Sequence, residues 1–228
     1  MPQPSLAEIT QASASALSPS LNSPFTPSLG GVDPLGLRQI NFDLMDLVLP
    51  GLNNVVRSIR PFTVMSWAWR RAALCAERAG KTMATVEELQ DFVDRIEVLF
   101  VWSQLLRDGT VDLPGRDFLA TLVRADGYTF GGPAWRAMRR TRKDSTALSA
   151  PVNYGPALKS LGWIEQSSEA LGVFKCTAIV TDALNALDRE LAPYLIHPAF
   201  SDLGTVFVSG TEAKEWSGAW ALNLPTVE

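Results

Sequence analysis

Residues 153–191 switch between helical and extended patterns over a short distance, and this stretch constrains the fold more than any other. Pro156 suits the first turn of a helix, because the amide that proline lacks would have no partner there. Gly162 is placed to end that helix. The segments 163–165 and 173–176 are rich in strand-forming residues and flank a polar loop, as the strands of a hairpin do. The stretch therefore predicts a short helix, a β-hairpin and then a longer helix.

The longer helix follows Thr177, whose hydroxyl can accept an amide of the first helical turn. Its apolar positions recur at alternating four- and three-residue steps, so they share one helical face. They are Val180, Leu184, Leu187 and Leu191. We expect Leu184 and Leu161, from the short helix, to be buried against one another's helices.

The motif "YGPALKSLGWI…GVFKCT…ALNAL" resembles the end of many bacterial winged-helix domains. In those domains a helix ending in "LGL(I/W)" precedes a wing strand and a capped "(Y/F)xLT" helix. The likeness covers about 40 of the 228 residues, and Val180 and Thr181 stand where a glycine is common early in the last helix. The resemblance implies a winged-helix-like module over residues 134–192. An unrelated αββα packing unit is the alternative.

A winged helix that binds DNA needs polar side chains on its recognition helix and Lys or Arg on its wing. The predicted wing instead carries two carboxylates, Glu165 and Glu169, which would repel phosphates. The predicted recognition helix offers Asn153, Tyr154, Lys159 and Ser160. The sequence therefore favours a module that contacts a partner protein, with DNA contact through another element as the alternative.

Positive charge is concentrated between residues 134 and 163. This segment has six basic residues and one acidic residue, a local charge of +5 in a chain whose net charge is −4. Arg136, Arg139, Arg140 and Lys143 are spaced so that they share one face of a helix. Together with Lys159 they are the candidate nucleic-acid-binding residues. A solvated basic face that pairs with the acidic helices is the alternative.

The residues before this region predict an arm and a helical bundle. Residues 1–32 are rich in Ser, Pro and Ala and carry one charge, so they have too little apolar surface to offset the entropy of ordering. We expect a disordered arm there and a bundle over 33–124. One bundle helix should end at Gly80. The motif "TVEE" at 85–88 is a capping box that opens a second helix, which Asp108 and Gly109 close.

The second bundle helix has an apolar and a polar face. Its predicted buried positions are Leu89, Phe92, Val93, Ile96, Leu99, Phe100 and Leu106. Its acidic residues, which we expect on the solvated side, are Glu87, Glu88, Asp91, Asp94 and Glu97. A glycine-rich loop over 124–133 should separate the bundle from the module, and the structure of the extension 193–228 is not evident from its pattern.

No motif indicates catalysis, a cofactor or a metal. Cys75 and Cys176 lack CxxC spacing, and with the single histidine, His197, they cannot supply a usual zinc ligand set. We therefore expect a protein that is not an enzyme and uses no cofactor, metal or small-molecule substrate. An enzyme of an unrecognised class is the second alternative. No apolar span is long enough for a membrane and no signal segment is evident, so we expect a cytoplasmic protein.

The stretch 49–70, which contains "LPGLNNVVRSIRPFTVMSWAW", resembles the N-terminal part of uncharacterised bacterial proteins associated with mobile elements or phage defence. The resemblance carries no known catalytic residues. It implies an interaction subunit of a bacterial multi-component system.

Removal of residues 1–32 should leave the stability of the remaining chain unchanged, because a disordered arm contributes no packed surface. The thermal midpoints of the full and shortened chains, followed by circular dichroism, test this. A loss of several degrees on deletion would contradict it.

Overall fold

The computed structural model divides into two compact units, Met1–Leu47 and Val48–Glu228. It describes residues 58–80, 84–109, 111–119, 126–141, 154–168 and 170–222, together with residues 40, 44 and 48. The side chains at 117, 118 and 138–141 are not part of this description. The arm expected over 1–32 lies outside the described residues.

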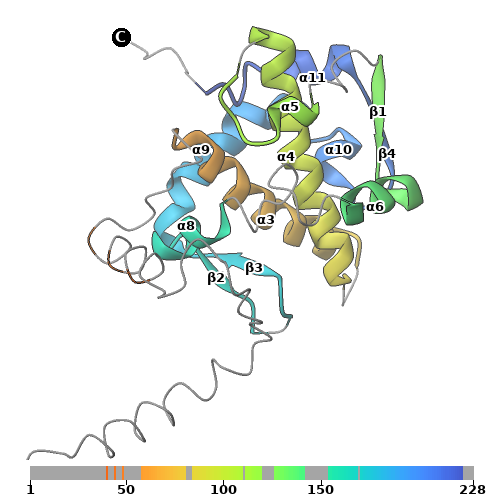
Figure 1. The fold of residues 1–228 in the computed structure, drawn as a ribbon. Helices are drawn as coiled ribbons and strands as arrows, with labels where there is room; N and C mark the ends of the chain where they lie inside the picture. Colours follow the sequence, from red (N-terminus) through yellow and green to blue (C-terminus); the bar gives the residue numbers. More distant parts are fainter. Residues whose placement is uncertain are drawn as a thin grey trace, which may run out of the picture. The chain divides into compact units, whose positions relative to one another are not determined.

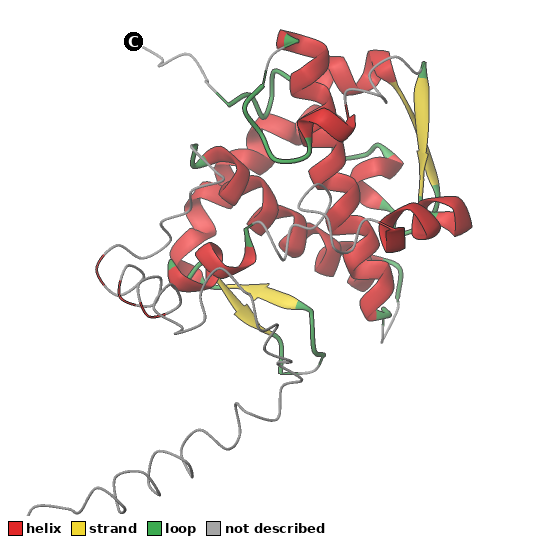
Figure 2. Ribbon diagram, in the orientation of Figure 1, coloured by secondary structure: helices red, strands yellow, loops and turns green. Residues whose placement is uncertain are grey.

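The described part of the second unit is mainly helical with two small antiparallel sheets (Figures 1 and 2). This confirms a mainly α fold with a small β-hairpin. The elements, in order, are α3 (Arg60–Arg78), α4 (Val86–Asp108), α5 (Arg116–Leu119), β1 (Gly127–Phe130), α6 (Gly132–Thr141), α8 (Gly155–Ser160), β2 (Ile164–Gln166), β3 (Phe174–Cys176), η2 (Ala178–Val180), α9 (Thr181–Leu191), η3 (Ala192–Tyr194), α10 (Pro198–Ser201), β4 (Val206–Ser209) and α11 (Gly210–Trp216).

The ends of α4 follow the local sequence. The Thr85 hydroxyl accepts the amide of Glu88 at 3.2 Å, and the Glu88 carboxylate accepts the amide of Thr85 at 2.9 Å, which is the predicted capping box. Gly109 ends the helix in the left-handed conformation, with φ of 67°. Both signals act within one helical turn, so the sequence alone could locate them.

Helix α4 is buried along its whole middle, not on one face only. Every residue from 91 to 105 is buried, including the acidic Asp91, Asp94 and Glu97. The prediction that these three carboxylates lie on a solvated face is therefore wrong. The reason is that α3 and α11 both pack along α4, so the polar positions of the helix are enclosed together with the apolar ones.

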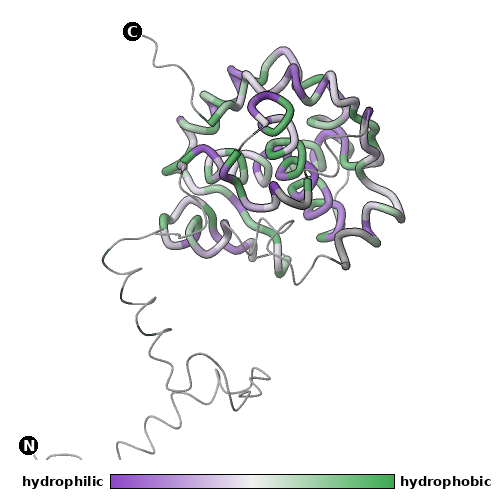
Figure 3. Tube along the Cα trace, turned by 45° about the horizontal axis from the view of Figure 1, so that its top comes forward, coloured by the Kyte–Doolittle hydropathy of each residue, from purple (hydrophilic) through white to green (hydrophobic). Residues whose placement is uncertain are grey.

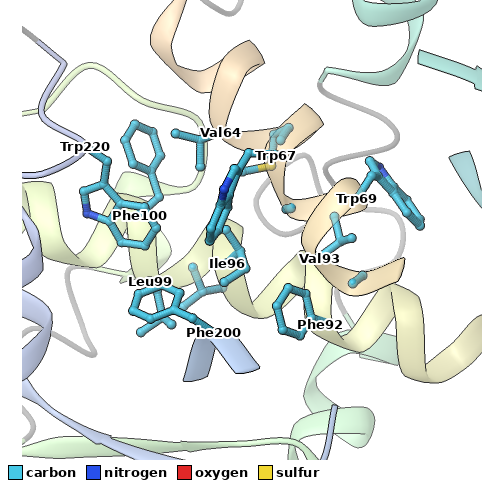
Figure 4. Packing of buried hydrophobic residues seen from close by; sticks show 14 of the residues in the cluster. Val64, Trp67, Trp69, Phe92, Val93, Ile96, Leu99, Phe100, Phe200 and Trp220 are labelled. Carbon is cyan, nitrogen blue, oxygen red and sulfur yellow. The ribbon is translucent and has the colours of Figure 1, made fainter. Parts of the chain in front are cut away.

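Aromatic rings join distant parts of the chain in the core (Figure 4). Trp67 from α3 meets Phe200 from α10 edge to face, with ring centroids 6.1 Å apart. Phe200 also contacts the ring of Trp220 at 5.6 Å, and Trp220 contacts Phe100 of α4 at 5.8 Å. Residues after 193 thus contribute to the same core as the two long helices. Figure 3 shows hydrophobic and hydrophilic positions alternating along this unit.

The stretch 154–191 folds as predicted into a short helix, a hairpin and a longer helix. Strands β2 and β3 are antiparallel, with Ile164 opposite Cys176 and Gln166 opposite Phe174. The predicted apolar face of the last helix is buried: Val180, Leu184, Leu187 and Leu191.

Two details of this αββα unit differ from the predictions. Leu161 is partly exposed, because α8 ends at Ser160 and the chain turns at Gly162, which leaves Ala157 and Leu158 to face the core. The Thr177 hydroxyl does not cap the following helix. It donates a 2.6 Å hydrogen bond to the carbonyl of Gly162 and so joins the two ends of the hairpin.

The segment predicted as a loop over 124–133 contains a strand. Strand β1 pairs antiparallel with β4, with Gly127 opposite Ser209 and Phe130 opposite Val206. A side chain at Gly127 would collide with the ring of Phe207 and the carbonyl of Val208, so the close pairing requires glycine. Because its partner lies about 80 residues further along the chain, β1 has no local signal.

Helix α6 lies beside β1 and β4, whereas α8 lies with β2, β3 and α9 on the other side of α3 and α4 (Figure 1). The Phe130 and Trp135 rings, 5.2 Å apart, join β1 to α6. Residues 134–192 thus contribute to two separate regions of the unit, and residues 193–222 provide the end of η3 together with α10, β4 and α11. Helices α3 and α9 pack together, so the expected bundle and module share one core.

Replacement of Leu184 by Ala should lower the free energy of unfolding by about 2–5 kcal/mol, because the side chain is only 1% exposed in this core. Chemical denaturation measures the change. Leu171→Ala is the matched control: this leucine is 89% exposed, so its loss should change stability by less than about 0.5 kcal/mol. Equal effects of the two substitutions would mean that the packing of α9 is misassigned.

Candidate functional site

Of the predicted nucleic-acid-binding residues on α6, Arg136 is paired within the protein. Its Nε donates to Oδ2 of Asp91 at 3.0 Å and lies 3.8 Å from Oε1 of Glu87. The hydrogen bond and the charge of Asp91 raise the pKa of Arg136. Arg139 and Arg140 lie in α6, but their side chains are outside the description, and so is the whole of Lys143.

Lys159 lies on α8, away from α6 (Figure 1). Its side chain is exposed, and its Nζ lies over the ring of Phe174 at 4.7 Å from the centroid. Tyr154, another residue of the predicted recognition helix, is fully buried and meets Phe62 edge to face at 6.0 Å. The structure therefore does not bring Lys159 beside Arg136, and it removes Tyr154 from the surface.

The hairpin presents a mixed surface with an apolar tip. Glu165 and Lys175 are opposite one another across the two strands, so their charges are of opposite sign at neighbouring positions. Leu171 at the tip is almost fully exposed. The carbonyl of Gly172 accepts a 3.1 Å hydrogen bond from Gln90 Nε2, which anchors the tip to α4. The tip is thus an exposed aliphatic group on an anchored support.

A second exposed aliphatic side chain lies at the other end of the hairpin. Ile179, in η2, is 73% exposed. Its Cδ1 would be 3.6 Å from a side chain at Gly162, so it covers the turn that follows α8. Leu171 and Ile179 were not singled out by the sequence pattern, because an isolated Leu or Ile in a short element gives no sign of exposure.

Two buried arginines fix the segment between residues 195 and 204. Arg71 of α3 donates to the carbonyl of Phe200 at 2.8 Å and to that of Leu195 at 3.0 Å. Arg95 of α4 donates to the carbonyl of Gly204 at 2.9 Å and to that of Asp202. Burial lowers the pKa of Arg95 to about 10. Their acceptors are backbone carbonyls, which every residue type provides, so the sequence could not reveal these contacts.

Helices α3 and α9 are joined by a polar cluster. The indole Nε1 of Trp67 donates to Oδ1 of Asp188 at 2.6 Å. Arg70 donates to the other oxygen of Asp188 and to Oδ1 of Asn185, the latter at 2.9 Å. These bonds orient the αββα unit on α3.

A cavity of about 320 Å³ lies between the end of α3 and α10. It is lined by Cys75, Arg78, Ala79, Pro198, Ser201, Asp202 and Leu203. The Cys75 thiol donates to the carbonyl of Phe200 at 3.4 Å, and burial raises its pKa. Burial also raises the pKa of Cys176, to about 11. Both cysteines are free thiols, and neither is activated as a nucleophile, since that requires a lowered pKa.

Within the described ranges, no three His, Cys, Asp or Glu side chains gather as metal ligands would. None of the helices in the described part of the chain has the length and apolar character needed to cross a bilayer. Comparisons with models of known protein families, with curated proteins and with solved structures found no match.

Replacement of Arg95 by Met should lower the free energy of unfolding by about 2–4 kcal/mol, because the hydrogen bonds from its buried guanidinium group to two backbone carbonyls would be lost. Urea denaturation measures the effect. Arg107→Met is the control on the same helix: Arg107 is exposed and its hydrogen bond to the carbonyl of Ser217 is long, at 3.4 Å, so its loss should cost under about 0.5 kcal/mol. If the two variants are equally stable, Arg95 does not hold the 195–204 segment.

Proposed function

We propose that this chain is a non-enzymatic interaction subunit of a bacterial multi-component system and that its αββα unit contacts a partner protein. The unit comprises α8, β2, β3, η2 and α9. The observation that carries the proposal is the tip of the hairpin, where Leu171 is 89% exposed. The basic residue of the two strands, Lys175, lies opposite Glu165, and the exposed side chain at the tip is a leucine, which gains free energy only by leaving water for an apolar partner surface.

The exposed tip has the properties of an interface anchor. Burial of one leucine side chain in a partner's pocket stabilises a complex by about 1.5–3 kcal/mol. The hydrogen bond from Gln90 to Gly172 holds the tip against α4 before any partner binds. A tip that is already ordered loses less conformational entropy on binding, so more of the contact energy appears as affinity.

The contacts and the burial of the described basic and polar residues also favour a protein partner over DNA. Arg136 is engaged with Asp91, and Tyr154 is buried. Lys159 is exposed with its Nζ over the ring of Phe174, and it stands on a different side of the molecule from α6. An array of phosphate contacts needs several cations on one surface, and Arg136 and Lys159 do not form one.

DNA binding through residues 136–143 is the second candidate function. Its support is the local charge of +5 over residues 134–163, to which Arg139, Arg140 and Lys143 contribute. A phosphate contact on this helix would be independent of base sequence.

The setting that we propose, a bacterial system such as phage defence, is based on the resemblance of residues 49–70. Residues 60–70 of this stretch lie in α3, where the residues from Pro61 to Trp69 are buried. We therefore assign the described part of this stretch to the core of the protein and the partner contact to the αββα unit.

Binding to the proteins encoded beside this gene tests the proposal. Leu171→Glu should weaken the complex about tenfold or more, because a carboxylate would replace a buried leucine at the interface. Ile196→Glu is the matched control, since Ile196 is 88% exposed but lies outside the αββα unit, and it should bind like the wild type. Isothermal titration with each candidate gives the affinities. A partner that binds Leu171→Glu as tightly as the wild type would exclude the hairpin tip as the contact.

Duplex DNA at low salt separates the two candidate functions. We expect no measurable binding by fluorescence anisotropy. If binding occurs and falls steeply with salt, and if reversal of Arg139 and Arg140 to Glu flattens the salt slope by roughly two units, the second candidate is correct. Such a result would overturn the protein-contact proposal for the region 134–192.

A further inference from the structure

His197, the only histidine of the 228 residues, stands between η3 and α10. Its Nδ1 accepts the backbone amide of Ala199 at 3.1 Å, so the imidazole acts as the N-cap of α10. A ring nitrogen can accept a hydrogen bond only while it carries no proton. This cap therefore exists only in the neutral form of His197, with the proton on Nε2.

The other ring nitrogen faces the cap of a second helix. Nε2 of His197 lies 3.4 Å from Oε1 of Glu212. The second oxygen of Glu212, Oε2, accepts the amide of Ser209 at 2.8 Å and its hydroxyl at 2.7 Å, which completes the capping box of α11. One imidazole thus contacts the N-terminal caps of both α10 and α11.

Protonation changes these two contacts in opposite directions. A proton on Nδ1 turns the acceptor into a donor that points at the amide hydrogen of Ala199, so the cap of α10 is lost. The same proton makes the ring a cation, which strengthens its attraction to the Glu212 carboxylate. The ring therefore exchanges the cap of one helix for an ion pair with the other.

Charged groups from the neighbouring elements define the surroundings of the ring. Glu212 reaches it from α11, and hydrogen bonds from Ser209 hold the pKa of Glu212 below its usual value, so this carboxylate is ionised above mildly acidic pH. Arg71 of α3 donates to the carbonyls of Leu195 and Phe200, which precede and follow His197 in the chain. Asp202, at the end of α10, accepts the amide of Gly204 at 2.7 Å.

We propose that His197 is a pH-sensitive switch that joins the caps of α10 and α11, so that its protonation releases the N-terminus of α10 and tightens the contact with α11. Imidazole changes its charge between about pH 5 and 8, where unperturbed carboxylates and lysines do not. Arg71 and Arg95 hold the carbonyls of Leu195, Phe200, Asp202 and Gly204 and so confine the change to the start of α10.

The protein carries its own reporters for this change. Because there is one histidine, its ring gives a single set of NMR signals that can be followed through a titration. The Trp216 ring lies 4.9 Å from the His197 ring, so its fluorescence should respond to the position and charge of the imidazole. The amide of Ala199 reports directly on the cap.

The test is an NMR titration of the full chain from pH 8 to pH 5. The Ala199 amide should shift and exchange faster with solvent, with the same midpoint as the histidine ring signals, and Trp216 emission should change with them. An Ala199 amide that stays protected while the ring becomes protonated would overturn the proposal.

Two conservative variants complete the test. His197→Asn keeps a side chain that caps helices well but does not titrate, so the response of Ala199 and Trp216 between pH 8 and 5 should disappear. Glu212→Gln keeps a residue suited to a capping box but removes the charge, so the ion pair with the protonated ring should be lost and the change in Trp216 emission should become smaller. Persistence of the response in His197→Asn, or an unchanged Trp216 response in Glu212→Gln, would contradict the mechanism.

Discussion

The enclosure of α4 is the constraint on which the other elements depend. Its residues from 91 to 105 are all buried, so a polar side chain of that region gains a partner only from within the protein. Several of these side chains bond to segments far along the chain. Asp91 accepts a hydrogen bond from Arg136 of α6, and Arg95 donates to the carbonyls of residues 202 and 204. The Ser103 hydroxyl oxygen accepts a 2.9 Å hydrogen bond from the indole Nε1 of Trp220, and Gln104 donates to the carbonyl of Ser217. Just before the buried region, Gln90 holds the hairpin tip. One helix therefore positions α6, the hairpin and the residues after 195.

This arrangement combines apolar burial with polar specificity. The buried hydrophobic core, which includes Trp67, Phe100, Phe200 and Trp220, excludes water from the centre of the unit and provides most of the driving force. Rings alone would tolerate several relative positions of the segments. The guanidinium groups of Arg71 and Arg95 allow fewer relative positions, because each donates hydrogen bonds to two carbonyls at defined angles. The apolar contacts thus favour collapse, and the two arginines select the path of the chain from 195 to 204.

The same packing decides which groups remain for function. Arg136 is hydrogen-bonded to Asp91 of α4, and Tyr154 is buried in the core. Two polar residues that the sequence analysis considered for nucleic-acid contact therefore make contacts within the protein. The hairpin projects an aliphatic tip instead, with Leu171 exposed and its backbone anchored. A surface of this kind suits an apolar pocket on another protein. The proposed switch at His197 is separate from it, since it concerns the caps of α10 and α11.

The sequence by itself determined the elements whose signals are local. The capping box at Thr85, the left-handed Gly109, the hairpin around 164–176 and the buried face of α9 all follow from residues within a few positions of one another. Of the candidate site, the sequence located the hairpin but not the exposed residues at its ends. Tertiary structure alone decided that Gly127–Phe130 pairs with Val206–Ser209, that Thr177 bonds to Gly162, and that Asp94 and Glu97 are buried. The physical reason is that turns and caps are stabilised by neighbours along the chain, whereas strand pairing and the burial of charge depend on partners that only the folded core brings together.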